Sequence, residues 1–325
     1  MVRWGIVGAG KIAHTFSKDL ALVTGGKLMA VGSRSLEKAQ EFAAEYDAPH
    51  AFGSYEELFL SDTVDVVYIA TPHTGHMDLA IKAMEAGKHV LCEKPMGINK
   101  GEVEKMIKAA KENNVFLMEA LWSRFNPTIK AVKDIVDKGE IGKIGYLYSD
   151  FAFYALDRDE NGRLLNPDLA GGSLLDIGIY PIFLSYLILG MPSDIVAKVH
   201  FHETGVEKQC SMIFDYPDAH AMLYSGLTSD SEMKSEISGS KGSVFINPRW
   251  HEATSYTLEK DGDSKTVEIP KIGKGYGHEI KEVHNCLASG KLESDLWSHQ
   301  NSLDLISLMD SIRLKTDIKF PFEQQ

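Results

Sequence analysis

The feature that most constrains the fold is a glycine-rich turn close to the N-terminus. Gly8, Gly10 and Ala13 form a Gly-x-Gly-x-x-Ala pattern between an apolar run and an amphipathic run. The glycines let the backbone turn tightly and approach a phosphate, and the small alanine lets a helix pack closely on a strand. The start of that helix presents unpaired N–H groups to an anion. The pattern therefore predicts a strand, a turn and a helix that bind a dinucleotide pyrophosphate, with the turn residues Gly8, Gly10, Lys11 and Ile12 as contacts.

The end of the second predicted strand, residues 27–32, indicates which dinucleotide is bound. Ser33 and Arg34 follow this strand, and Lys38 comes one helical turn later. Proteins that bind NAD place a carboxylate here, which accepts a hydrogen bond from the ribose 2′-hydroxyl. This chain has no carboxylate at the strand end, whereas a guanidinium and a hydroxyl suit a 2′-phosphate. A solvated basic loop is the alternative, but the pattern favours NADP over NAD.

Composition and charge limit the class of protein. The chain has 325 residues, 44% of them hydrophobic and 25% charged, which is enough for two domains with full cores. Its net charge of −12 argues against a nucleic-acid surface. Three scattered cysteines fit a reducing compartment, and the first strand leaves no room for a signal peptide. The most apolar run, residues 173–189, is broken by Asp176. We expect a cytoplasmic protein that does not interact with a membrane.

The order of the predicted elements indicates an α/β fold with two domains. Strands and helices alternate over the first third, with six strands by about residue 120, which is typical of a doubly wound parallel sheet. From about residue 146 several runs resemble long antiparallel strands, and two helices at about 276–288 and 299–314 close the chain. We predict an N-terminal NAD(P)-binding Rossmann domain over residues 1–122. Residues 123–325 are predicted to form an α+β domain for substrate binding and oligomerisation, with an open, mainly antiparallel sheet.

Ligands of an open α/β sheet bind beyond the carboxyl ends of its strands. Besides the glycine turn, two strand ends carry reactive side chains. Lys94 follows an apolar strand, next to a glutamate that can orient it and before a proline that restricts its backbone. We therefore predict that Lys94 is catalytic rather than an ordinary surface lysine. The residues at these two strand ends that we expect to contact the cofactor are Thr71, Pro72, His73, His76, Glu93 and Lys94.

A second group of candidate residues lies in the segment 171–181. Asp176 and Tyr180 are four positions apart and share one face if the segment is helical. An acid and a phenol suit the recognition of a hydroxyl group and proton transfer to it, although a buried tyrosine beside a capping aspartate is the alternative. A nearby ammonium such as that of Lys94 would lower the pKa of the phenol.

The aromatic segment 119–127 has two interpretations. Trp122, Arg124 and Phe125 form the wall of a substrate pocket or pack between domains. The histidines show no spacing typical of metal ligands, and we predict no metal site.

These motifs resemble the Gfo/Idh/MocA family of oxidoreductases over nearly the whole chain. The resemblance rests on the glycine turn, Ala70-Thr71-Pro72, Glu93-Lys94-Pro95 and the segment that ends in Asp176-Ile-Gly-Ile-Tyr180. Residues 118–127 are similar to the branch of dimeric dihydrodiol dehydrogenases and NADP-dependent D-xylose 1-dehydrogenases. The resemblance implies a catalytic Lys94 with a cis bond to Pro95. It also implies that Tyr180, where many members have histidine, is the acid/base, and that the second domain's sheet forms a homodimer or homotetramer.

The combined expectation is an NADP-dependent oxidoreductase for a small polyhydroxylated substrate of the sugar, dihydrodiol or dicarbonyl type. Hydride would pass between the nicotinamide and a carbinol or carbonyl carbon, with Tyr180 exchanging the proton and Lys94 stabilising the oxyanion. Asp176 would bind an adjacent hydroxyl. Two alternatives are an NADP-binding regulator without turnover, which retention of Lys94 and Tyr180 disfavours, and an NAD-dependent glycosidase, which Ser33 and Arg34 disfavour.

Overall fold

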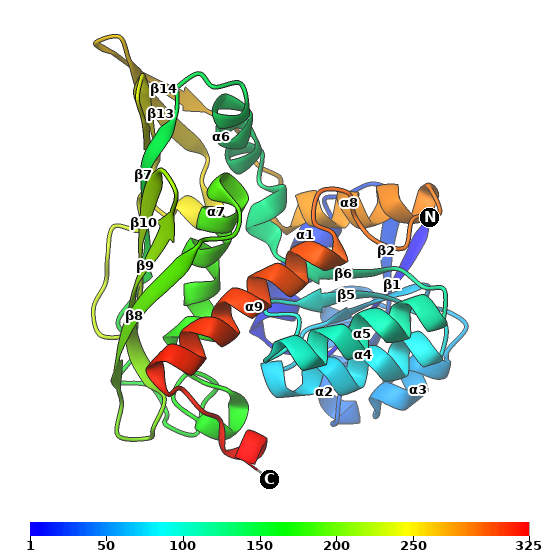
Figure 1. Cartoon of the computed structure of the whole chain (residues 1–325). Coiled ribbons are helices and arrows are strands. Elements are labelled where there is room, and N and C mark those ends of the chain that lie inside the picture. Colours follow the sequence, from blue (N-terminus) through cyan, green and yellow to red (C-terminus); the bar gives the residue numbers. More distant parts are fainter. Residues whose placement is uncertain (325) are drawn as a thin grey trace. The chain divides into compact units, whose positions relative to one another are not determined.

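The computed structural model describes residues 1–324, which form two compact units (Figure 1). The first unit comprises Met1–Phe125 and Lys271–Leu303, and the second comprises Asn126–Pro270 and the residues from Asp304 onward. The first division lies close to the boundary predicted after residue 122. Residues 271–303, which the sequence prediction assigned to the second domain, return to the first unit.

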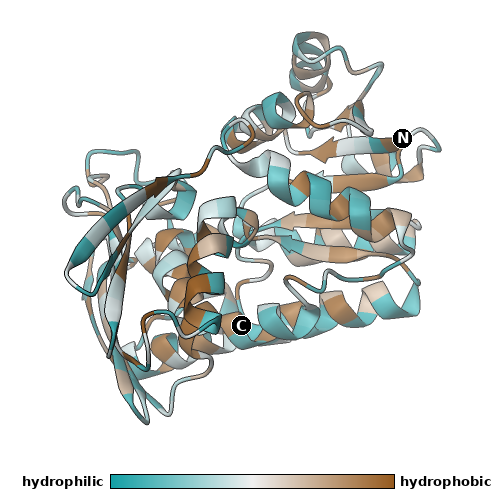
Figure 2. Ribbon diagram, turned by 90° about the horizontal axis from the view of Figure 1, so that it is seen from above, coloured by the Kyte–Doolittle hydropathy of each residue, from teal (hydrophilic) through white to brown (hydrophobic). Residues whose placement is uncertain are grey.

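The first unit contains a six-stranded parallel sheet, as predicted for a Rossmann domain. The strand order is β3-β2-β1-β4-β5-β6, so the order reverses between the adjacent strands β1 and β4. Every residue of β4 is buried, as expected for a parallel strand covered on both faces. Figure 2 shows the strands near the N-terminus mostly in the brown of hydrophobic residues. The strands are β1 (Val2–Val7), β2 (Gly26–Gly32), β3 (His50–Phe52), β4 (Val66–Ile69), β5 (His89–Glu93) and β6 (Leu117–Ala120).

Helices cover both faces of this sheet. Helices α1 and α8 pack together on one face, and α4 and α5 pack together on the other (Figure 1). The short helix α3 was not predicted. Ser54 caps it by accepting a hydrogen bond from the Glu57 N–H. The helices of this unit are α1 (Lys11–Leu20), α2 (Leu36–Glu45), α3 (Tyr55–Leu60), α4 (His76–Glu85), α5 (Lys100–Glu112) and α8 (Tyr276–Ala288).

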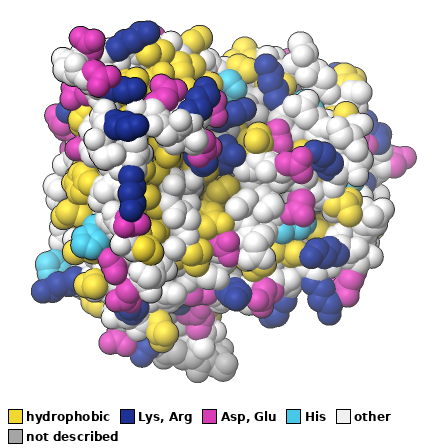
Figure 3. Space-filling model, turned by 45° about the horizontal axis from the view of Figure 1, so that its top comes forward, with side chains coloured by type: hydrophobic (Ala, Val, Ile, Leu, Met, Phe, Trp, Pro, Cys, Tyr) yellow, Lys and Arg dark blue, Asp and Glu magenta, His cyan; other side chains and the backbone are white. Residues whose placement is uncertain are grey.

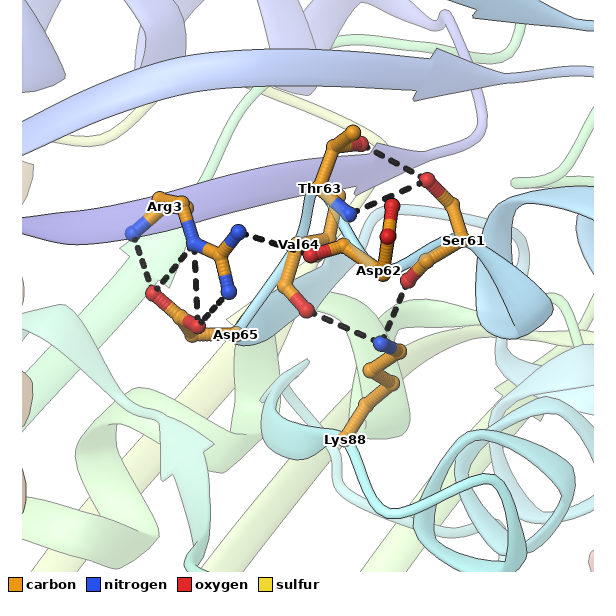
Figure 4. Close-up of polar contacts among 7 residues, drawn as sticks. All are labelled: Arg3, Ser61, Asp62, Thr63, Val64, Asp65 and Lys88. Carbon is orange, nitrogen blue, oxygen red and sulfur yellow. Dashed lines mark hydrogen bonds and ion pairs between the residues drawn. The ribbon is translucent and has the colours of Figure 1, made fainter.

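Polar contacts fasten the amino ends of neighbouring strands. The Arg3 guanidinium of β1 donates to the carboxylate of Asp65, which precedes β4, and the Arg3 backbone N–H donates to the same carboxylate (Figure 4). The Lys88 ammonium, which precedes β5, donates to the carbonyls of Ser61 and Val64. These groups lie at the edge of the sheet opposite the carboxyl ends, so we assign them a structural role.

One buried aspartate is among the residues that join segment 271–303 to the first unit. The carboxylate of Asp19 on α1 accepts hydrogen bonds from the backbone N–H groups of Lys274, Gly275 and Gly277, where α8 begins. Side-chain acceptors of this kind satisfy the unpaired N–H groups at a helix start. The contact joins residues far apart in the sequence, and no local pattern predicts it.

The second unit contains an eight-stranded sheet in the order β14-β13-β12-β11-β7-β10-β9-β8. All neighbouring pairs are antiparallel except β7 and β10, which are parallel. This confirms a mainly antiparallel sheet. Its strands are β7 (Ile144–Ala152), β8 (Asp194–Phe201), β9 (Glu207–Tyr216), β10 (Ala219–Gly226), β11 (Ser235–Gly239), β12 (Gly242–Ile246), β13 (Ser255–Lys260) and β14 (Asp263–Glu268).

The two faces of this sheet differ in exposure. The register aligns a fully covered row of side chains across six strands: Ile195, Phe214, Ala221, Leu147, Ile237 and Val244. The helices α6 (Pro127–Asp137) and α7 (Ile179–Leu189) lie on one side of the sheet (Figure 1). An adjacent row consists of Val196, Ile213 and Met222, which are 61%, 42% and 47% exposed. Within the described residues, the sheet therefore has one covered face and one exposed face that carries this apolar row.

A π-helix, Leu174–Gly178, leads directly into α7. The helical stretch Pro167–Leu189 meets the length and hydropathy of a membrane span, but 78% of its most apolar window is buried. This is the position of a core helix. The last long helix, α9 (His299–Thr316), contributes residues to both units.

Candidate functional site

The glycine turn has the geometry that phosphate binding requires. Gly8 has a φ of +99°, and a Cβ there would lie 3.2 Å from the Ala70 carbonyl oxygen, so the position needs glycine. Gly10 caps α1 without any side-chain hydrogen bond, which leaves the N–H groups of Lys11 and Ile12 at a helix start. The neighbouring Thr71 Oγ1 is buried and has no hydrogen-bond partner among residues 1–324. The Thr71 methyl group faces Gly8, and its Oγ1 would lie 3.2 Å from a Cβ at Gly75. The uncapped start of α1 beside the glycine turn fits a phosphate group.

The end of β2 presents positive charge to solvent. Ser33 is buried, and its Oγ accepts a hydrogen bond from the Ser35 N–H at 3.3 Å. Arg34 and Lys38 are exposed. Burial raises the pKa of Tyr55 and the Arg34 guanidinium opposes that rise, which shows that Arg34 lies near the Tyr55 hydroxyl. The strand end thus carries two exposed basic side chains, and its preference for a 2′-phosphate stays a prediction.

The backbone of Lys94 is positioned by the preceding residue, Glu93. Glu93 is buried at the end of β5, and its Oε2 accepts a hydrogen bond from the Lys94 backbone N–H at 3.2 Å. The Tyr68 hydroxyl of β4 donates to the other carboxyl oxygen of Glu93. Burial and the charge of Glu93 hold the pKa of Tyr68 well above its usual value, so Tyr68 stays a donor. The Lys94–Pro95 peptide bond is cis, as the family resemblance implies.

His76 ties the loop after β4 to the segment after β5. Its Nδ1 lies 2.8 Å from the Pro95 carbonyl oxygen and its Nε2 lies 2.9 Å from that of Thr71. Both partners only accept hydrogen bonds, so the imidazolium form alone would satisfy both. Burial and the Lys94 charge nevertheless lower the pKa of His76, which favours the neutral ring. His73 lies 5.7 Å from His76, between ring centres, and Pro72 is exposed.

Glu119 on β6 is a supporting residue whose role the sequence did not reveal. Its Oε1 accepts from the Met96 N–H at 2.9 Å, while its Oε2 accepts from Trp297 Nε1 at 3.0 Å and Ser302 Oγ at 2.7 Å. Burial raises its pKa and these donors oppose the rise. The segment that follows Lys94 is therefore anchored to β6.

Trp122 and Phe125 are buried in a short 3₁₀ helix, Trp122–Phe125. The Trp122 ring stacks on Tyr276 with ring centres 4.7 Å apart, and a Cβ at Gly275 would lie 3.0 Å from the same ring. Arg124 is partly exposed. Packing against α8 thus accounts for Trp122 within the first unit, and its role in a pocket stays a prediction.

Tyr180 and Asp176 lie in the second unit, on α7 and the π-helix before it. Tyr180 is buried, and its ring lies 5.3 Å from Phe151 and 5.4 Å from His251, between ring centres. The Asp176 carboxylate forms an ion pair with Arg163, from Nη1 to Oδ1 at 2.5 Å. Asp176 is nearly covered, whereas the Arg163 side chain is 54% exposed. An opposite charge this close favours the ionised carboxylate, which accepts hydrogen bonds.

Sequence reasoning missed Arg163 and His251 as neighbours of these residues. Arg163 lies in an irregular segment, and no spacing relates it to Asp176. His251 lies on a 3₁₀ helix (Trp250–Glu252), with its ring stacked on Phe151 at 4.2 Å. A parallel pairing brings β7 and β10 together, and a long-range hydrogen bond from Trp250 Nε1 to the Asp150 carbonyl positions the histidine. Among residues 1–324 no cluster of histidine, cysteine and acidic side chains is suited to hold a metal ion.

Comparison with known proteins agrees with this geometry. Residues 2–121 match the model of an oxidoreductase family with an NAD-binding Rossmann fold, and residues 129–245 match the Gfo/Idh/MocA C-terminal domain. The chain is 35% identical to trans-1,2-dihydrobenzene-1,2-diol dehydrogenase of Mus musculus over 100% of this chain and 99% of the relative. It is also 35% identical to an NADP⁺-dependent scyllo-inositol 2-dehydrogenase of Bacillus subtilis over 100% of both chains.

Solved structures show the same likeness. A 3-ketoreductase from Actinomadura kijaniata, in complex with NADP and TDP-benzene, superimposes with a TM-score of 0.88 at 25% identity. The superposition covers 97% of this chain and 98% of the reductase. Both domain models and the relatives matched over their full length place the protein in one family. The chain belongs to the Gfo/Idh/MocA family of oxidoreductases.

Proposed function

We propose that the protein transfers a hydride between NADP and a carbinol or carbonyl carbon of a small polyhydroxylated molecule. The substrate class is a sugar, a dihydrodiol or a dicarbonyl. The proposal rests on the residues that follow three neighbouring strands of the first unit. Neighbouring strands β1, β4 and β5 end at the glycine turn, at Thr71 and at Lys94. Ligands of doubly wound sheets bind at such an edge, next to the reversal of strand order.

The choice of NADP is supported by charge at the end of β2. Arg34 and Lys38 are exposed, and no carboxylate follows the strand directly. The B. subtilis relative is named as NADP⁺-dependent, and the A. kijaniata reductase holds NADP. A guanidinium binds a 2′-phosphate through two parallel hydrogen bonds, whereas the hydroxyl of NAD would leave it unpaired. We therefore assign the 2′-phosphate contact to Arg34, assisted by Ser33 and Lys38.

The chain's own side chains have separate roles in the proposed reaction. NADP supplies or accepts the hydride at its nicotinamide ring. Tyr180 gives or takes the proton of the substrate hydroxyl, and the Lys94 ammonium stabilises negative charge on the substrate oxygen. Asp176, which pairs with Arg163, accepts a hydrogen bond from a neighbouring hydroxyl. Trp122, Arg124 and Phe125 remain proposed substrate contacts.

The charge of the surface supports the proposed partners, and the burial of the cysteines supports the proposed location. Acidic and basic side chains are interspersed over the face drawn in Figure 3, and the chain carries 46 acidic against 34 basic residues. Such a surface does not suit nucleic acid. The cysteines Cys92, Cys210 and Cys286 are buried thiols, in keeping with a cytoplasmic protein. We propose a homodimer or homotetramer formed through the open face of the second unit's sheet.

A substrate screen tests the function. The purified protein is incubated with NADP⁺ or NADPH and a panel of aldoses, ketoses, α-dicarbonyls and trans-dihydrodiols, and nicotinamide absorbance is followed. The same panel with NAD⁺ and NADH is the control. Turnover with at least one class, faster with the phosphorylated cofactor, is the expected result. Tight NADP binding without turnover of any class would instead indicate a regulator.

A further inference from the structure

Glu207 connects the second sheet to the segment that carries Asp176 and Tyr180. It is the first residue of β9 and is 1% exposed. Its Oε1 accepts a hydrogen bond from the backbone N–H of Leu174 at 2.7 Å, at the point where the π-helix begins. A Cβ at Gly172 would overlap both carboxyl oxygens, and Gly172 has a φ of +118°. Only glycine lets the turn lie this close to the carboxylate.

Burial sets the titration of Glu207 near neutrality. It raises the pKa to about 7, while the N–H groups of Leu174 and Ser173 and the Arg313 guanidinium oppose the rise. Arg313 on α9 also pairs with Asp310 and Glu323. Cys210, on the same strand, has a pKa raised by burial and by Glu207, so its thiol stays neutral. Glu207 is thus the group in this set that changes charge around pH 7.

We propose that Glu207 is a positioning residue for the reaction: its carboxyl group holds the start of the π-helix and thereby orients Asp176 and Tyr180. This inference rests on the proposed function. The folded site raises the pKa of Glu207, so it favours the protonated carboxyl group, whose Oε1 still accepts from the Leu174 N–H. Ionisation of the buried group therefore loosens the turn that begins at Leu174. Turnover falls as the pH rises above about 7, in addition to any titration of Tyr180.

The first test measures the turn directly and needs no substrate. Amide hydrogen exchange of the peptide that covers residues 172–180 is followed at about pH 6 and about pH 8 and expressed as protection relative to the unfolded chain. In the wild type, protection of the Leu174 amide should be about tenfold lower at the alkaline pH, because opening the turn lets water reach the ionised carboxylate. Glu207→Gln retains an oxygen acceptor but cannot titrate, so its protection should not depend on pH. The matched control is Glu203→Gln, because Glu203 is exposed and lies four positions away.

The second test measures turnover on a substrate found by the screen. Glu207→Gln resembles the neutral carboxyl group, so it should keep near pH 8 the kcat that the wild type shows only below pH 7. It should also leave the Kd for NADP unchanged and remove the inflection near pH 7. Glu203→Gln should behave as the wild type. Equal pH dependence of Leu174 protection in the wild type and Glu207→Gln, or an unchanged kcat profile in that variant, would overturn the proposal. A wild type without turnover refutes the proposed function instead, and amide exchange then decides the role of Glu207 alone.

Discussion

Arg34 is the residue on which the choice between NADP and NAD depends. Replacing it with aspartate removes the donors for a 2′-phosphate and adds a repelling charge. The Kd for NADP should rise by the equivalent of at least about 1.5–3 kcal/mol, while the Kd for NAD changes much less. Fluorescence titration with both cofactors checks this. Lys27→Asp makes the same change in charge at the other end of β2 and should leave both Kd values alone. Equal loss for both cofactors after the Arg34 change would contradict the assignment.

Tyr180 and Lys94 are expected to act as one acid/base unit. Tyr180→Phe and Lys94→Met should each remove most turnover while NADP binding stays nearly intact. The double variant should be little worse than either single one, because groups that act together are not additive. Steady-state rates and cofactor fluorescence measure both quantities. Near-normal turnover of Tyr180→Phe would mean that another residue, Asp176 or His73, exchanges the proton.

Stability at the scale of single elements depends on buried acids that join segments. Glu119 connects β6 to Met96, to Trp297 and to Ser302. Glu119→Leu removes the acceptor of three buried donors, so the free energy of unfolding should fall by about 2–4 kcal/mol. Ser302→Ala removes only one donor and is the milder control. Chemical denaturation measures the free energy of unfolding of both variants. An equal fall in both would show that the hydrogen bonds from Met96 and Trp297 contribute little.

Glu207 makes the stability of β9 and the π-helix depend on pH. Its folded pKa of about 7 lies above the usual value of 4.5, so the folded state binds more protons between these values. The free energy of unfolding therefore falls as pH rises from about 4.5 through about 7, by up to about 3 kcal/mol. Glu207→Gln should lack this decline. Thermal unfolding of both proteins across this range measures it, and parallel curves would contradict the assigned pKa.

At the scale of the whole molecule, the open face of the second sheet indicates self-association. Val196, Ile213, Met222 and Tyr148 face each other across β8, β9, β10 and β7, and the first three are well exposed. A contiguous apolar row of this kind is typical of an interface. Ile213→Lys should shift the protein towards the monomer in sedimentation velocity at micromolar concentration. Leu60→Lys, at a position that is 81% exposed in the first unit, should not. A wild type that sediments as a monomer would refute the interface.

Local features of the fold could be predicted from the sequence, because strand and helix patterns repeat over a few residues. The six parallel strands, the glycine turn and Gly242–Ile246 illustrate this. The order of elements indicated the strand ends that carry Thr71 and Lys94, and short motifs indicated the family. The pattern did not reveal α3, which has six residues, or α6, which has 11.

Contacts between distant segments were decided only by the tertiary structure. The pairing of Arg163 with Asp176, the capping of α8 by Asp19 and the hold of Glu207 on Leu174 join residues 13 to 258 positions apart. The parallel pairing of β7 with β10 likewise depends on how the chain crosses the sheet. The residues next to a side chain in the sequence do not specify such partners. Side chains become buried, and distant backbone segments come close to them, only when the whole unit packs. For this reason the sequence indicated the candidate catalytic residues. Only the fold determined which distant residues contact them and influence their charge.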